Sequence, residues 1–163
     1  MAFTIRNSFP EDQDAIWRLL RPVIESGETY ALPQDYSREQ SLAYWCSSDH
    51  HVFVAADEEE QVVGTYFLAA NQKGGGSHVA NCGYITLAAA RGRGIGRAMC
   101  AHSLDQARAL GFKAMQFNFV ISSNASAVRL WRDMGFWVVG VLPHAFLHPT
   151  LGFVDVFIMF RTL

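Results

Sequence analysis

The stretch Arg91-Gly92-Arg93-Gly94-Ile95-Gly96-Arg97 stands between a strand-like apolar run (79–87) and an Ala/Leu-rich segment typical of a helix (96–110). Glycines let backbone N–H groups approach an anion closely. The first turn of a following helix adds unpaired N–H groups at the positive end of its dipole. The three arginines can add charge at the rim. The stretch therefore predicts a binding site for a phosphate or pyrophosphate group.

Three kinds of phosphate-binding loop compete for this stretch. A Walker loop ends in Gly-Lys-Ser/Thr, but Gly96 is followed by Arg97-Ala98. A dinucleotide-binding GxGxxG beginning at Gly92 needs glycine at position 97 and belongs near the start of a Rossmann domain. Both fit poorly. The remaining pattern is Arg/Gln-x-x-Gly-x-Gly/Ala between a strand and a long helix. The alternative is a glycine-rich turn that binds no ligand.

A second motif follows at residues 124–136, which read Asn-x-x-Ala-x-x-Leu-Trp-x-x-x-Gly-Phe. Asn124 is a favourable residue for the start of a helix, and Gly135 is favourable just after its end. Together, the loop and this motif resemble the GNAT superfamily of acetyl-CoA-dependent acetyltransferases, and the resemblance covers nearly the whole chain.

The apolar periodicity gives an order of elements that agrees with this resemblance. Strand-like runs lie at 2–7, 51–56, 62–68, 79–87, 115–121, 137–142 and 153–160, and helix-like segments at about 10–26, 37–45, 96–110 and 125–134. The resemblance implies an α/β (α+β) GNAT fold, in which a mixed sheet of about seven strands has a splayed central parallel pair and about four helices. We expect residues 1–163 to form a single domain.

The resemblance also implies how the coenzyme binds. In GNAT proteins the strand before the loop diverges from its parallel neighbour, and its exposed backbone pairs with the pantetheine amides. An amine entering from the other side attacks the thioester directly in a ternary complex. The expected contacts with acetyl-CoA are Tyr84, Ile85, Thr86, Arg91, Gly92, Arg93, Gly94, Ile95, Gly96, Arg97, Asn124 and Trp131.

Two proton-handling positions depart from the common family pattern. The carboxylate often found on the central strand is replaced by Asn81, which cannot act as a general base. The tyrosine that commonly serves as general acid is replaced by Trp131, whose indole N–H does not donate a proton at neutral pH. We therefore expect proton transfer through ordered water or from another donor such as Tyr84. A non-catalytic acyl-CoA-binding or sensing domain is the alternative.

A narrower resemblance rests on residues 77–84, 89–96 and 117–120. These segments are similar to fungal acetyltransferases that detoxify proline analogues such as azetidine-2-carboxylate. In that group, asparagines at the places of Asn81, Asn118 and Asn124 line the active site, and tryptophan replaces the usual tyrosine. The candidate catalytic residues are accordingly Asn81, Asn118 and Tyr84. Both Asn81 and Asn118 can also be hydrogen-bonded polar residues at strand ends.

The acceptor pocket of GNAT folds is walled by two loops. Here these are the loop between the first two helices and the predicted loop between the last two strands. The candidate substrate contacts are Glu28, Tyr30, Asn81, Asn118 and His144, with His148 in the same predicted loop. Ordinary loop packing remains an alternative for both histidines. The expected acceptor is a small-molecule amine or amino acid, and a protein N-terminus is the alternative.

Composition limits the partners and the location. Thirteen basic and fifteen acidic residues nearly cancel, so neither nucleic acid nor a membrane surface is an expected partner. Three cysteines without CxxC spacing indicate neither a disulfide framework nor a zinc site, and the histidines lack metal-ligand spacing. No signal peptide or membrane span is recognisable. We expect a cytoplasmic protein without a metal. Many GNAT proteins are homodimers, but the sequence leaves the oligomeric state open.

Overall fold

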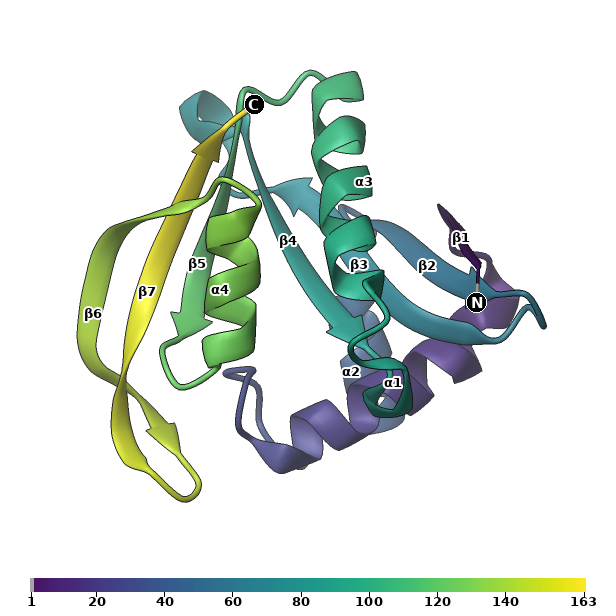
Figure 1. Cartoon of the computed structure of the whole chain (residues 1–163), viewed down its shortest axis with the longest axis horizontal. Helices are drawn as coiled ribbons and strands as arrows, with labels where there is room; N and C mark the ends of the chain where they lie inside the picture. Colours follow the sequence, from purple (N-terminus) through teal and green to yellow (C-terminus); the bar gives the residue numbers. More distant parts are fainter. Residues whose placement is uncertain (1) are drawn as a thin grey trace.

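The computed structural model describes residues 2–163, and these form seven strands and four α-helices in the predicted order (Figure 1). The elements are β1 (Phe3–Asn7), α1 (Gln13–Ser26), α2 (Arg38–Trp45), β2 (His51–Asp57), β3 (Val62–Ala70), β4 (Val79–Thr86), α3 (Ile95–Ala109), β5 (Ala114–Ile121), α4 (Ala125–Asp133), β6 (Trp137–His148) and β7 (Gly152–Thr162). No helix in this range is long and apolar enough to cross a membrane.

The strands form one mixed sheet in the order β1-β2-β3-β4-β5-β7-β6. Every neighbouring pair is antiparallel except β4 and β5, which are parallel. The predicted α/β fold class is therefore confirmed, including the parallel pair at the centre of the sheet.

The parallel pair separates soon after it begins. Only Val79↔Ala114 and Ala80↔Met115 are in register. In contrast, β4 stays paired with β3 as far as Thr86. In Figure 1 the two arrows diverge toward their carboxyl ends, which leaves a gap in the middle of the sheet.

Two hydrophobic cores hold the helices against opposite faces of the sheet. The core under α1 and α2 contains Ile16, Leu20, Trp45, Phe67 and Ile85. The core under α3 and α4 contains Met99, Leu104, Met115, Phe117 and Val128. Because burial of apolar area is the main stabilising contribution, the two cores fix the helices on both sides of the gap.

The hairpin of β6 and β7 is longer than the sequence predicts. Residues 143–151 were expected to form a loop, but β6 continues to His148 and the turn occupies only 149–151. The register shifts between Leu142 and Phe146, so that a bulge accommodates Pro143 and His144. Proline lacks a ladder N–H, and His144 has a φ of 52°. Proline therefore marks a bulge within the strand, and the predicted loop is wrong.

Candidate active site

The gap beside β4 presents backbone groups that no neighbouring strand uses. Asn71 N–H donates to Val79 C=O (2.8 Å), so the odd-numbered residues of β4 direct their backbone groups toward β3. By alternation, Cys82, Tyr84 and Thr86 direct their N–H and C=O groups toward β5, past the point where that strand has separated. These three residues form an edge to which an extended ligand can add.

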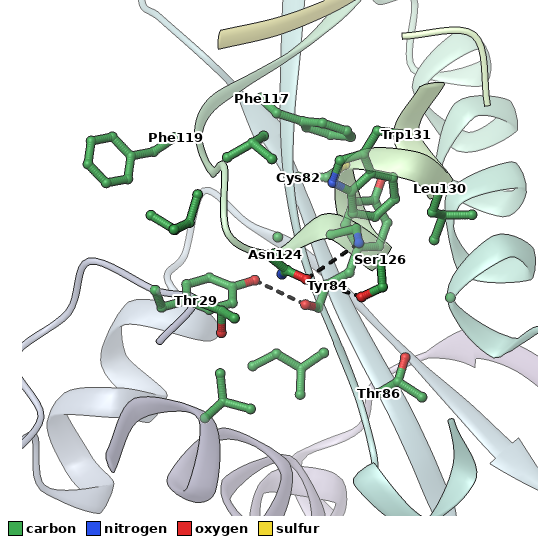
Figure 2. Close-up of a pocket in the computed structure, with 18 of the residues that line it drawn as sticks. Thr29, Cys82, Tyr84, Thr86, Phe117, Phe119, Asn124, Ser126, Leu130 and Trp131 are labelled. Atoms are coloured by element: carbon green, nitrogen blue, oxygen red, sulfur yellow. Dashed lines mark hydrogen bonds between the residues drawn. The ribbon is translucent and has the colours of Figure 1, made fainter. Parts of the chain in front are cut away.

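A cavity of about 850 Å³ passes through this gap and reaches both faces of the sheet. Figure 2 shows residues from β4, β5 and α4 gathered around it. On the α3/α4 side its lining includes Thr86, Gly92, Gly94, Gly96, Asn124, Leu130 and Trp131. On the α1/α2 side the lining includes Glu28, Tyr30, Tyr44, Phe67, Asn81 and Asn118. Within residues 2–163, no cluster of His, Cys, Asp or Glu could hold a metal ion.

The glycine loop leaves the amino end of α3 open to an anion. Gly92 and Gly94 have φ values of 77° and 78°, and a Cβ at either position would meet no atom within 4 Å. The first helical bond runs from Ala98 N–H to Gly94 C=O (3.0 Å), so the N–H groups of residues 95–97 lack helical partners. No acidic side chain lies in the first turn. The residues present thus fit a pyrophosphate group.

The three arginines of the loop lie in different places. Arg91 is exposed and lines the cavity. The guanidinium of Arg97 binds the carboxylate of Asp133 (2.8 Å), which ties the start of α3 to the end of α4. Arg93 is not part of the cavity lining. Arg91 is therefore the loop arginine best placed to meet a bound phosphate.

Asn124, at the start of α4, and Trp131, within it, both line the cavity. The Oδ1 atom of Asn124 accepts from Ala127 N–H (3.4 Å) and from Ser126 Oγ (3.2 Å), which makes Asn124 the N-cap that the sequence predicts (Figure 2). The ring of Trp131 packs at 5.0 Å from that of Tyr84, between centroids. Trp131 thus forms part of the wall on the α3/α4 side.

The side chain of Tyr84 points into the core under α3. Its hydroxyl lies 2.7 Å from Ser103 Oγ and 3.8 Å from Met115 Sδ. Burial raises the pKa of Tyr84 well above the ordinary value, so the phenol keeps its proton. This placement argues against the hydroxyl as a proton donor, and the Tyr84 backbone is the part that faces the gap.

Tyr30 reaches the same backbone from the α1/α2 side. Its hydroxyl donates to Tyr84 C=O (3.1 Å), and burial raises the pKa of this phenol also. A Cβ at Gly83 would lie 2.5 Å from Phe67 Cε1 and 3.0 Å from the Tyr30 oxygen. Gly83 therefore allows the two rings to lie against β4. Gly83 was not among the predicted site residues, although a glycine inside a strand signals a close approach of this kind.

The two predicted asparagines lie on the α1/α2 side of the gap. Asn81 and Asn118 both line the cavity there. Asn118 Nδ2 donates to Asn71 Oδ1 (2.5 Å), and Gln116 Nε2 donates to Asn118 Oδ1 (2.8 Å). Because Asn71 follows β3 and Asn118 belongs to β5, this bridge crosses β4 near the point where the parallel pair separates. No local sequence pattern points to Asn71.

The remaining candidate contacts divide into two groups. Glu28 and His148 line the cavity, whereas His144 does not. The backbone N–H of His144 donates to the Asp155 carboxylate (3.0 Å) within the hairpin bulge. His148 Nδ1 accepts the backbone N–H groups of Thr150 and Leu151 at 3.2 and 3.3 Å, which holds the ring against the turn of the hairpin. Of the two histidines, His148 is thus the one that lines the cavity.

Ile85 and Gly96 both line the cavity but have different surroundings. The backbone groups of Ile85 face β3, and its side chain packs in the core under α1. A Cβ at Gly96 would lie 3.4 Å from Leu130 Cδ2 and 3.8 Å from Thr86 Oγ1, so the start of α3 lies close to both α4 and the end of β4. Ile95 is almost fully buried beneath the loop and anchors the start of the helix.

The family described as acetyltransferase (GNAT) matches residues 14–136. The chain belongs to this acetyltransferase family. A solved GCN5-related N-acetyltransferase from Kribbella flavida is 39% identical, with a TM-score of 0.96 over 99% of this chain and 98% of that chain. The N-acetyltransferase aca1 of Schizosaccharomyces pombe is 26% identical over 151 residues, which is 83% of this chain and 72% of that protein.

The GNAT fold is shared with more distant enzymes. A phosphinothricin acetyltransferase from Sinorhizobium meliloti, whose crystal structure contains acetyl-CoA, is 23% identical. Its TM-score is 0.87, over 100% of this chain and 89% of that chain.

Proposed function

We propose that this GNAT enzyme transfers the acetyl group of acetyl-CoA to the amine of a small molecule or amino acid, directly and in a ternary complex. The observation that carries the proposal is the cavity, which passes through the sheet at the gap between β4 and β5. One ligand can enter from each face, so the two reactants can meet without a covalent enzyme intermediate.

The coenzyme is assigned to the α3/α4 side. The pyrophosphate would be held by the N–H groups of residues 95–97, with Arg91 at the rim. The pantetheine arm would pair with the edge formed by Cys82, Tyr84 and Thr86, which no strand uses, and would lie against Trp131. At this edge Tyr84 C=O also accepts from the Tyr30 hydroxyl. This arrangement uses Cys82 in place of Ile85, because the backbone of Ile85 faces β3.

The acceptor is assigned to the α1/α2 side, beside Tyr30, Asn81 and Asn118. Asn81 cannot remove the proton from the amine, and the buried phenol of Tyr30 keeps its own. Among the lining residues of the described chain, Glu28 supplies the carboxylate on this side, whereas Nδ1 of His148 already accepts backbone N–H groups. We infer that the proton leaves to water in the cavity or to Glu28.

Thiol release tests this function. Purified protein, acetyl-CoA and a panel of amines and amino acids are mixed, and free coenzyme A is measured with a thiol reagent while the acetylated product is identified by mass. Amine-dependent thiol release with a matching product is the expected result.

Two alternatives give different outcomes in the same experiment. A non-catalytic acyl-CoA-binding domain, which the replacements Asn81 and Trp131 favour, would bind acetyl-CoA without turnover on any amine. A protein N-terminal acetyltransferase would acetylate short peptides and leave free amino acids and amines untouched. Either pattern would refute the proposed small-molecule reaction.

A further inference from the structure

Charge is distributed unevenly along the cavity. Among its lining residues within the described range 2–163, Arg91 and Arg97 are the arginines, and both lie at the coenzyme end beside α3. The opposite side carries the carboxylate of Glu28 and no lysine or arginine. The lining of the acceptor end therefore includes a carboxylate and no ammonium or guanidinium group.

The polar groups that remain on this side are partly engaged. The His148 ring uses Nδ1 to accept backbone N–H groups. Asn118 donates one amide hydrogen to Asn71 and accepts from Gln116. A carboxylate needs several donors, preferably a charged one, when it leaves water. The lining residues on this side include amide and hydroxyl donors such as Asn81 and Tyr44, but no lysine or arginine to supply a charged one.

Apolar and aromatic side chains form the rest of the acceptor wall. Leu32, Tyr44, Phe67 and Phe119 line the cavity. Tyr44 and Phe119 are 38% and 39% exposed, and the rings of Tyr44 and Phe67 meet edge to face with centroids 6.0 Å apart. Such a surface can bury a ring or a short hydrocarbon chain, and its ring faces attract a cationic nitrogen.

We infer that the acceptor is an alkyl or arylalkyl amine with an apolar body and without a carboxylate next to its nitrogen. The inference rests on the proposed acetyl transfer and names its substrate class. Glu28 attracts the ammonium form to the cavity mouth, and the aromatic wall receives the apolar body. An amino acid would bring a carboxylate that Glu28 repels and that finds no cation on this side.

The reaction balances without further reactants. After the ammonium ion releases a proton to water, the nitrogen lone pair forms a bond to the acetyl carbon. The bond between that carbon and sulfur then breaks with its electron pair on sulfur. The amide nitrogen loses its second proton, and the thiolate is protonated to give coenzyme A.

Matched pairs of acceptors test the inference. Pyrrolidine is compared with proline, and 2-phenylethylamine with phenylalanine, at saturating acetyl-CoA, with thiol release and product mass as the readouts. Because each pair differs only by the carboxylate, kcat/KM should be at least about tenfold higher for the amine. Equal or faster turnover of the amino acids would overturn the inference.

A pair of variants tests the part played by Glu28. Glu28→Gln should raise the KM for 2-phenylethylamine several-fold and leave the KM for acetyl-CoA unchanged. Glu25→Gln is the control, because Glu25 is exposed on α1, pairs with Arg21 (2.8 Å) and does not line the cavity. Equal KM values for 2-phenylethylamine in Glu28→Gln and the native enzyme would contradict the assigned role.

Binding measurements separate this inference from the proposed function. If no acceptor turns over, acetyl transfer to small molecules is refuted, and calorimetry on the protein saturated with coenzyme A decides the substrate class. Heat of binding from the amines but not from the amino acids would support the inference. Binding of the amino acids, or of neither class, would overturn it.

Discussion

The replacement Gly94→Ala tests whether the loop holds the coenzyme through its backbone. Gly94 has a φ of 78°, and a Cβ there would meet no protein atom within 4 Å. The added methyl group therefore causes no clash inside the protein. It would instead stand in the open space before the N–H groups of residues 95–97, where a phosphate oxygen is expected to approach.

Two separate costs follow from this geometry. The left-handed conformation costs an L-residue about 1–2 kcal/mol, which corresponds to a decrease of roughly 2–8 °C in Tm for a chain of this size. Loss of one hydrogen bond to a charged phosphate costs about 1.5–3 kcal/mol, or roughly a 10- to 150-fold increase in the Kd for acetyl-CoA. The variant should thus fold but bind the coenzyme poorly.

Gly111→Ala provides the matched control. Gly111 follows α3 with a φ of 87°, and a Cβ there also meets nothing within 4 Å, but it does not line the cavity. Thermal unfolding should show a similar loss of Tm in both variants, while isothermal titration with acetyl-CoA should separate them. Normal binding of acetyl-CoA by Gly94→Ala, or an equal loss of affinity in Gly111→Ala, would contradict a phosphate contact at the loop backbone.

Three further predictions concern other parts of the molecule. Asn71→Ala removes the acceptor of the Asn118 amide hydrogen, so the KM for the amine should rise about fivefold and Asn71→Asp should restore it; unchanged kinetics would exclude a positioning role. The Arg6 guanidinium holds the pKa of Asp12 below its ordinary value. The ion pair therefore stabilises the folded protein in full above the ordinary pKa of Asp12, and this stabilisation is lost as the pH falls through the lowered pKa. In urea titrations from about pH 6 to 2, the native protein should lose at most about 1 kcal/mol of unfolding free energy through this pair, and Asp12→Asn should not show this loss. An equal loss in the variant would contradict the role of the Arg6–Asp12 pair. Burial raises the pKa of the Cys82 thiol to about 12, so iodoacetamide at about pH 8 should modify Cys82 only after unfolding, as peptide mass spectrometry would show; rapid labelling of the native protein would disprove this.

Local sequence signals predicted most of the fold. Ser37 begins α2 through a capping box with Gln40 (2.9 and 3.2 Å), and Gly27 and Gly135 end α1 and α4 with φ values of 63° and 83°. Such signals act within a few residues, so the sequence contains them directly. The β6–β7 hairpin was underestimated because its bulge depends on pairing with β7, which no local pattern reveals.

The candidate site was predicted less completely. The loop, Asn124 and the splayed strand were expected from motifs. Asn71 and Gly83 were missed because their roles depend on partners far along the chain, Asn118 and Tyr30. Tyr84 was expected to offer its hydroxyl, but strand alternation directs that side chain to the core and its backbone to the gap.

Residues 91–97 alone were enough to predict the end of the cavity to which we assign the coenzyme. An anion site of this kind needs glycines with positive φ and a helix start without a side-chain cap. Both features are local, so they can be recognised within residues 91–97. The opposite end, to which we assign the acceptor, became recognisable only in the folded chain. Its wall combines Glu28, Phe67, Asn118 and His148 from four separate segments, and which of their atoms remain free depends on hydrogen bonds and packing that form when the sheet assembles.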